Sequence, residues 1–195
     1  MDDDLRIRES LQNLFLAAGH QVRTYEDPEI FLAARKPDMP CCALLDLNLG
    51  AVNGLDVQAR LGRDTALPVI FLTGFAEVPA AVQAMRAGAC HFLTKPVMQD
   101  ELLLAVNSAL QQAGREQQRR RTEAQTRGNY LTLTPRERDV LPYIVRGFLN
   151  KQTAYELGTS EITIRIHRGR IMHKMRADSL AHLVRLAAQV GIPQD

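Results

Sequence analysis

The stretch CCALLD, residues 41–46, decides the fold of the N-terminal half. It is a continuous apolar run that ends on Asp46, as expected of a parallel strand buried on both faces. Two more runs of this kind follow at residues 68–72 and 91–94, and helical patterns separate the runs. Because strands alternate with helices, the sequence predicts an α/β domain with a doubly wound parallel sheet.

The same periodicity places the other elements of this half. Helices are predicted at 5–18, 28–34, 54–61, 78–87 and from about 98 past 110, with a short strand at 21–25 and a loop at 47–53. Beyond residue 110 the chain is rich in Gln and Arg and poor in apolar residues. The last helix is therefore expected to pass into a solvated linker.

Groups with metal and phosphate chemistry fall at the ends of the predicted strands. Asp46, Thr73 and Lys95 each follow one apolar run, and Asp2, Asp3 and Asp4 crowd the start of the chain. In an open α/β sheet ligands bind at the carboxyl ends of the strands, so we expect these groups to converge. Clustered carboxylates repel one another and suit Mg²⁺, and a carboxylate beside Mg²⁺ can form an aspartyl phosphate.

The net charge of +2 hides an asymmetry along the chain. Residues 1–114 hold 9 Lys and Arg against 14 Asp and Glu, residues 115–129 hold 5 against 2, and residues 130–195 hold 10 against 6. The basic C-terminal part indicates nucleic acid as its partner. No apolar run approaches the ~20 residues that span a bilayer and no signal-peptide pattern opens the chain, so we expect a cytoplasmic protein without membrane contact.

After residue 133 every predicted element is helical. Thr134 and Glu137 form a capping box around Pro135, and Asn150, Ser160 and Ser179 are predicted to cap three further helices. The helix after Ser160 combines an apolar face with a basic one. The apolar residues are Ile162, Ile164, Ile171 and Met175, and the cations are Arg165, His167, Arg168, Arg170 and Lys174. A basic helix of this size that follows a tight turn fits the major groove of double-stranded DNA.

Residues 2–112 resemble the receiver domain of two-component response regulators, which has a flavodoxin-like fold. The matching segments are Asp2-Asp3-Asp4, Asp46-Leu47-Asn48 with Gly54-Leu55, Leu72-Thr73-Gly74, residues 84–89 and Phe92-Leu93-Thr94-Lys95-Pro96. The resemblance implies that Asp46 accepts a phosphoryl group from a sensor histidine kinase. It further implies Mg²⁺ ligands at Asp2, Asp3, Asp46 and the Asn48 carbonyl, phosphate sensing by Thr73, Phe92 and Lys95, and a cis Lys95-Pro96 bond.

One feature departs from this family. Receiver domains have an apolar strand before the acidic cluster, in the middle of the sheet, whereas here Met1 directly precedes Asp2. The first strand is thus expected to be missing from the sheet. Either the natural chain begins upstream, or Asp2 is poorly fixed.

Residues 131–190 resemble the LuxR-type helix-turn-helix domain in its FixJ/NarL-like form. The matching segments are residues 133–138, 145–147, 150–152, 156–158, 162–164, 167–168 and 171–175. The resemblance implies that Arg165, Ile166 and Gly169 face the bases, with Lys151, Thr163 and His167 near phosphates. Many relatives have a longer side chain in place of Gly169, so base contacts are expected to shift to Arg168 or Arg170.

The sequence therefore predicts a receiver domain at 1–112, a linker at 113–130 and a DNA-binding domain at 131–195. The leading hypothesis is a transcription factor that is not an enzyme and forms a homodimer on phosphorylation. One alternative is a factor that ignores phosphate and uses a degenerate receiver for dimerisation. Another is a Mg²⁺-dependent phosphohydrolase, which is disfavoured because Asn48 stands where such enzymes need a second carboxylate.

Overall fold

The computed structural model describes residues 1–34, 38–62, 67–74 and 78–193. The chain divides into two compact units, Met1–Gln117 and Gln118–Asp195, and each is described by itself. Among the described residues, no helix is both long enough and apolar enough to cross a bilayer.

A parallel sheet forms the centre of the first unit, as the apolar runs predict. Its strands are β1 (Ala43–Leu45), β4 (Val69–Thr73) and β5 (His91–Thr94), in the order β1-β4-β5. In the register of the sheet, Ala43 pairs with Val69 and Ile70 pairs with His91. Every residue of β4 is buried, because this strand has a neighbour on each side and helices over both faces.

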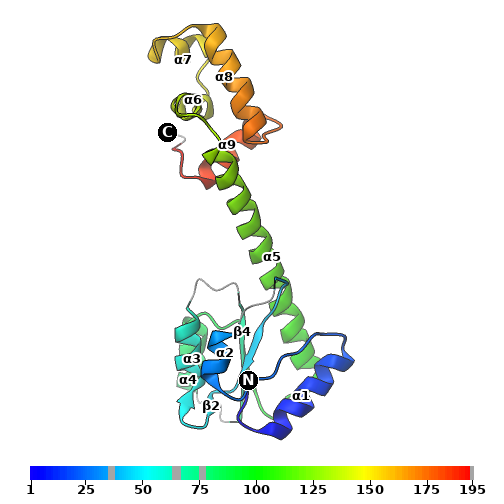
Figure 1. The fold of residues 1–195 in the computed structure, drawn as a ribbon. Helices are drawn as coiled ribbons and strands as arrows, with labels where there is room; N and C mark the ends of the chain where they lie inside the picture. Colours follow the sequence, from blue (N-terminus) through cyan, green and yellow to red (C-terminus); the bar gives the residue numbers. More distant parts are fainter. Residues whose placement is uncertain (35–37, 63–66, 75–77, 194–195) are drawn as a thin grey trace. The chain divides into compact units, whose positions relative to one another are not determined.

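Helices cover both faces of this sheet (Figure 1). The first four are α1 (Leu5–Ala17), α2 (Pro28–Ala33), α3 (Gly54–Leu61) and α4 (Val78–Arg86). On one face Phe15 of α1 packs with Ile70, Leu72 and residues of the later helix α5 (Gln99–Leu131). On the other face Val57 and Ala84 pack against Phe71. The prediction of a doubly wound α/β unit is confirmed.

Two local predictions for this unit are wrong. Residues 21–25 form no strand, since no neighbouring strand within the described ranges bonds to them, and Val22 packs against the α1/α5 side of the core instead. The loop at 47–53 contains a short antiparallel hairpin of β2 (Asn48–Leu49) and β3 (Val52–Asn53). Gly50 has a φ of +65° at its turn, a conformation that glycine adopts without steric cost.

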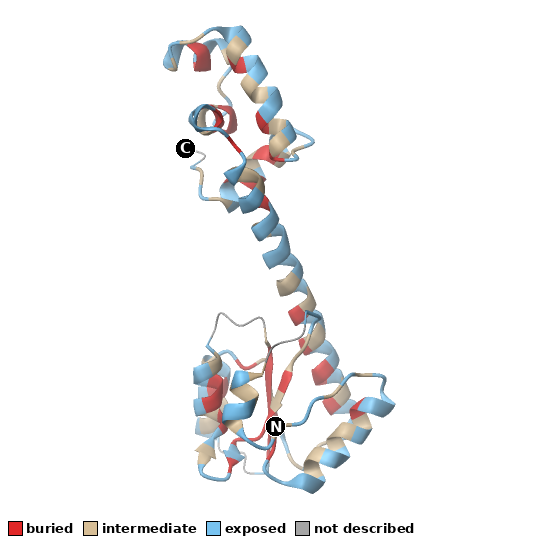
Figure 2. Cartoon of the chain, in the orientation of Figure 1, coloured by how far each residue is buried: buried red, intermediate tan, exposed pale blue. Residues whose placement is uncertain are grey.

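Helix α5 (Gln99–Leu131) continues for 33 residues without a break. Its first half contributes Leu102, Ala105, Val106, Ala109 and Ala113 to the core of the first unit. The Gln- and Arg-rich stretch, predicted as a helical extension that passes into a solvated linker, is helical as far as Leu131, since Gln, Arg, Glu and Ala all favour helix. Residues 118–122 of this stretch are exposed (Figure 2).

The second unit is helical, as predicted. After the end of α5 it contains α6 (Pro135–Val145), α7 (Asn150–Glu156), α8 (Glu161–Lys174) and α9 (Leu180–Gln189). Thr134, Ser160 and Ser179 cap their helices as predicted. Asn150 does not cap α7; it is the first helical residue, and the Gln152 side chain accepts a hydrogen bond from the backbone of Leu149.

Apolar side chains of all four of these helices meet in one core. Leu141 and Ile144 of α6, Ile164 and Ile171 of α8 and Leu183 of α9 are almost completely buried in it. Ile162, assigned from the sequence to the apolar face of this helix, does not join them. It lies two residues before Ile164, about 200° away around the helix, and 67% of it is exposed.

Candidate functional site

The acidic site lies at the carboxyl ends of the parallel strands, where the sequence predicts it. Asp46 directly follows β1, Thr73 ends β4 and Lys95 follows β5. The Nζ atom of Lys95 lies 2.7 Å from Oδ2 of Asp2 and 2.7 Å from Oδ2 of Asp46. Asp2, Asp46 and Thr73 are buried, so the pair of carboxylates and its counter-cation are largely removed from water.

Asp2 is firmly held, contrary to the alternative in which it was poorly fixed. The backbone nitrogen of Asp46 donates to the carbonyl of Met1 at 3.1 Å, which places Met1 beside the end of β1. The backbone nitrogen of Asp4 donates to Oδ1 of Asp2 at 3.0 Å. Arg8 of α1 donates to the carbonyl of Asp2 at 2.8 Å. These backbone hydrogen bonds and Arg8 together fix the position of Asp2.

The Asp4 side chain has a different role from those of Asp2 and Asp3. It accepts a hydrogen bond from the backbone of Arg6 at 2.8 Å and caps α1. An N-cap oxygen satisfies a backbone donor that the helix leaves open. Asp4 therefore acts on the helix, and Asp2 and Asp3 remain for the acidic site.

The acidic site has the donor atoms that a hard cation requires. Carboxylate oxygens of Asp2, Asp3 and Asp46 all lie within 4.8 Å of one another, and Asp3 is exposed. Asn48 follows in the adjacent hairpin, and its backbone nitrogen donates to Oδ1 of Asp46 at 3.2 Å. Oxygen ligands of this kind fit Mg²⁺.

The two carboxylates keep Lys95 charged. Partial burial by itself lowers the pKa of Lys95, but its hydrogen bonds to Asp2 and Asp46 outweigh burial and raise that pKa above its ordinary value. The Lys95-Pro96 peptide bond is cis, as the resemblance implied. Lys95 is thus a permanent cation placed between the two acidic groups.

Phe92 is half-buried, and in the register of the sheet it is the partner of the buried Phe71 on β4. The centres of the Phe71 and Phe92 rings are 6.1 Å apart. Phe92 also packs against the core on the α3/α4 side of the sheet. The structure therefore shows a packed aromatic ring two residues from Thr94 and three from Lys95, and its predicted movement stays a prediction.

Gly54 approaches the backbone of Asp46 closely, a contact that the sequence motif around Asp46 did not predict. Its backbone nitrogen donates to the carbonyl of Leu47 at 2.7 Å. A Cβ atom at position 54 would overlap the carbonyl oxygen of Asp46. Only glycine lets the start of α3 come this close to the backbone of Asp46, and this contact closes the β2-β3 hairpin.

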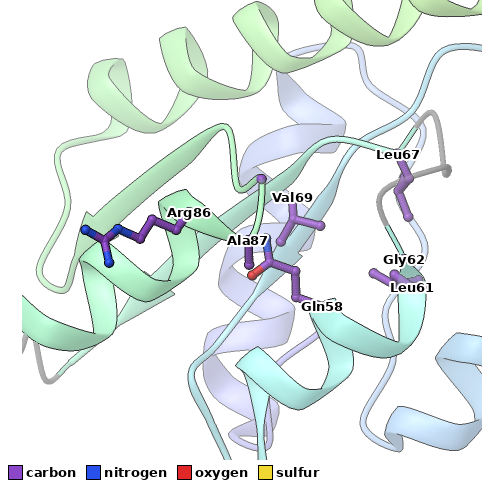
Figure 3. A pocket seen from close by; sticks show the side chains of 8 residues that line it. Gln58, Leu61, Gly62, Leu67, Val69, Arg86 and Ala87 are labelled. Atoms are coloured by element: carbon purple, nitrogen blue, oxygen red, sulfur yellow. The ribbon is translucent and has the colours of Figure 1, made fainter.

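A separate pocket of about 360 Å³ lies at the opposite end of the sheet (Figure 3). It is lined by the end of α3, the start of β4 and the end of α4, with Gln58, Val69 and Arg86 among the lining residues. Gln58 donates from Nε2 to the carbonyl of Ala84 at 3.3 Å. None of the predicted site residues lines this pocket.

The candidate DNA interface lies on α8. One side of this helix is exposed at every third or fourth residue, and we call it the groove stripe: Ile162, Arg165, Ile166, Gly169, Arg170 and His173. Of the predicted DNA contacts, Arg165, Ile166, Gly169 and Arg170 lie on this stripe. Thr163, His167 and Arg168 are half-buried on α8, and Lys151 is exposed on α7. Sequence reasoning missed Ile162 and His173 as stripe residues, although helical spacing from Ile166 would have found both.

Lys174 does not lie on the groove stripe. Its ammonium group pairs with a buried carboxylate. Its Nζ is 2.6 Å from Oε2 of Glu137, whose side chain is 1% exposed. Burial alone would raise the pKa of Glu137, but hydrogen bonds from Lys174 and Thr134 outweigh it and lower that pKa. The same Lys174 also donates to the carbonyl of Thr132 at 3.2 Å. Lys174 thus ties the end of α8 to the start of α6.

The fold, the acidic site and the helix-turn-helix together define a response regulator that binds DNA. Residues 1–107 match the family described as the response regulator receiver domain, and residues 131–187 match the luxR family of bacterial regulatory proteins. The chain belongs to these families: it is a response regulator with a luxR-type DNA-binding domain, and phosphorylation-based activation is the mechanism of its class.

Named relatives agree with this assignment. The chain is 41% identical over 193 residues to nodulation protein W of Bradyrhizobium diazoefficiens, covering 98% of this chain and 85% of that protein. It is 37% identical to the response regulator TodT of Pseudomonas putida over 97% of this chain and 84% of TodT. Among solved structures, the response regulator StyR matches with a TM-score of 0.86 at 38% identity, over 97% of this chain and 96% of that one.

Proposed function

We propose that Asp46 is the phospho-acceptor of this regulator. The observation that carries the proposal is the placement of the Asp46 carboxylate at the end of β1, 2.7 Å from Lys95 and grouped with Asp2 and Asp3. A carboxylate oxygen of Asp46 attacks the phosphorus of a kinase phosphohistidine, the P–N bond breaks, and an acyl phosphate forms. Lys95 then offsets charge on the transferred phosphoryl oxygens.

Asp2, Asp3, Asp46 and the Asn48 carbonyl would hold Mg²⁺ at this site. The ion supplies charge neutralisation for the carboxylates and for the incoming phosphoryl group. Asp2 is prepared for this role because its carbonyl, Oδ1 and Oδ2 are each hydrogen-bonded. The protein then has no catalytic task beyond accepting and keeping the phosphoryl group.

The phosphoryl group would act through Thr73 and Phe92 on the face of α4, β5 and α5, which we propose as the homodimer surface. Exposed apolar residues on this part of the chain support the proposal: Val78, Val82 and Met85 on α4, Met98 before α5 and Leu104 on α5.

Dimerisation would pair two copies of α8 on neighbouring half-sites of double-stranded DNA. The groove stripe would face the bases, with Lys151, Thr163, His167 and Arg168 toward phosphates. Because its proposed partners are DNA and a sensor histidine kinase, we propose that the regulator acts in the cytoplasm.

The gating step is tested by comparing the full chain with Asp46→Asn. Radiolabelled acetyl phosphate should label the wild type in Mg²⁺ and leave Asp46→Asn unlabelled. The same phosphodonor should tighten DNA binding by the wild type alone. If Asp46→Asn gains DNA affinity equally, the regulator uses its receiver unit without phosphate, for dimerisation only. Glu26→Gln, an exposed change outside the carboxylate cluster, is the matched control.

A further inference from the structure

Of the six residues of the groove stripe, two are arginines, one is a histidine, and three are apolar or have no side chain. Ile162 is 67% exposed and Ile166 is 49% exposed, one helical turn apart. Gly169 follows on the same side, and a Cβ atom built there meets nothing within 4 Å. The stripe therefore presents aliphatic carbon over its first half and open space in its middle.

These three residues do not serve the helix itself. A β-branched side chain that packs on nothing lowers helix propensity, and glycine in a helix interior costs about 1 kcal/mol relative to alanine. The core of the unit is built by the opposite side of α8, from Ile164 and Ile171. Single exposed apolar residues are ordinary, but here two of them share a line with Arg165 and Arg170.

The cations on the same line determine what covers these residues. Arg165 and Arg170 are exposed, and Arg165 lies 3.8 Å from Glu161, one turn away. A protein partner would have to bury these guanidinium groups against carboxylates, whereas the floor of the major groove offers acceptors and apolar groups side by side. The apolar group that DNA presents there is the 5-methyl group of thymine.

We propose that Ile162 and Ile166 contact thymine methyl groups, so that the half-site of this regulator contains thymines read through apolar contact. Gly169 leaves the space into which the next base edge or methyl group enters. The proposal rests on the proposed function of α8 as the groove-reading helix. It adds the chemistry of the site that the helix selects.

The test removes methyl groups from DNA one at a time. Duplexes enriched by the full chain from a randomised pool are resynthesised with deoxyuracil in place of each thymine of the half-site. At each contacted thymine we expect binding to weaken about 4-fold, which corresponds to ~0.8 kcal/mol for one buried methyl group. Ile162→Ser and Ile166→Ser should each abolish this difference at one thymine. Leu131→Ser, an exposed leucine on α5, is the control and should keep it.

The outcomes separate the proposal from the function on which it depends. Enrichment of a half-site without thymine, equal binding of thymine and deoxyuracil duplexes, or discrimination that persists in both serine variants would each overturn the methyl contacts while DNA binding stands. If the full chain enriches no sequence at any salt concentration, groove reading by α8 fails, and the methyl contacts with it. The proposal is supported if the two isoleucine variants, but not the Leu131→Ser control, lose the binding difference between thymine and deoxyuracil duplexes.

Discussion

Lys95 bridges Asp2 and Asp46, with its Nζ atom 2.7 Å from a carboxylate oxygen of each. One cation thus holds together two buried acids that would otherwise repel each other. The carboxylates of Asp2, Asp3 and Asp46 outnumber this one ammonium group, so the site keeps a net negative charge that suits a cation. The proposed phosphorylation adds negative charge at Asp46, so the Lys95 ammonium would divide its hydrogen bonds between the carboxylates and the phosphoryl oxygens.

Replacement of this lysine should destabilise the receiver unit. In Lys95→Met the two carboxylates lose a charged hydrogen-bond donor, and we expect a loss of about 1–3 kcal/mol in the free energy of unfolding. Because Mg²⁺ is proposed to bind the folded site, we expect its addition to recover part of that loss. Urea unfolding with and without Mg²⁺ measures both effects. An unchanged midpoint without Mg²⁺ would contradict the bridging role.

Arg8 should control the affinity of the acidic site for Mg²⁺. Its side chain is 10% exposed, and it donates to the carbonyl of Asp2 at 2.8 Å and to Glu26 at 2.8 Å. Groups that orient metal ligands typically contribute 10- to 100-fold in metal affinity, so Arg8→Met should weaken Mg²⁺ binding by about 10-fold. Titration calorimetry with Mg²⁺ measures the change.

The control for Arg8 is Glu26→Gln, which removes the exposed partner and leaves the contact with Asp2. Glu26→Gln should bind Mg²⁺ nearly as the wild type does, because an exposed ion pair contributes little. If both variants lose affinity equally, then the Arg8–Glu26 pair acts on the fold of this region and not on Asp2.

Glu137 should make the second unit sensitive to acid. Its pKa in the folded protein is below the ordinary value of 4.5, so its contribution to stability is present above that pH and is lost as pH falls through the folded pKa. Glu137→Gln should lower the free energy of unfolding by about 1–3 kcal/mol at neutral pH, because Lys174 and Thr134 lose a charged acceptor. The difference between wild type and variant should narrow below pH 4.5. Thermal unfolding of the full chain from pH 3 to pH 7 tests this. A stability difference that stays constant over this range would show that Glu137 is not the acid-sensitive group.

Two glycines of the helix-turn-helix should respond oppositely to alanine. At Gly169 a methyl group meets open space inside a helix, so Gly169→Ala should stabilise the unit by about 1 kcal/mol. Gly158 has a φ of +60° in the turn before α8, so Gly158→Ala should destabilise it by about 1–2 kcal/mol. Chemical unfolding of both variants measures the pair. Stabilisation by Gly158→Ala would show that the turn adopts another conformation.

The sheet and the acidic site were predictable because each depends on local pattern. Apolar runs predicted the strands, and topology then brings their carboxyl ends together, which gathers Asp46, Thr73 and Lys95. The β2-β3 hairpin was not predictable in this way, because strands of two residues carry too little alternation. The strand at 21–25 failed for another reason: composition says nothing about whether a neighbouring strand is available to bond.

The helical unit shows a similar division. Caps at Thr134, Ser160 and Ser179 follow from residue type and spacing, and all three are present. Lys174 was predicted as a DNA contact because it is a cation on a basic helix. Its partner Glu137 is 37 residues away, and only the packing of α6 on α8 brings them together. The contact of Arg8 with the Asp2 carbonyl, by contrast, spans only six residues, from the first part of α1 back to the chain just before it.

The Lys174–Glu137 pair has a consequence for the ionic-strength dependence of DNA binding. Each cation that neutralises a DNA phosphate releases counterions and steepens the dependence of log affinity on log salt concentration by about 0.9. The charge of Lys174 is already offset by Glu137, so we expect this lysine to add little to counterion release on DNA binding. A count of basic residues on α8 therefore overstates how strongly salt weakens the complex, and a larger share of its affinity persists at high ionic strength.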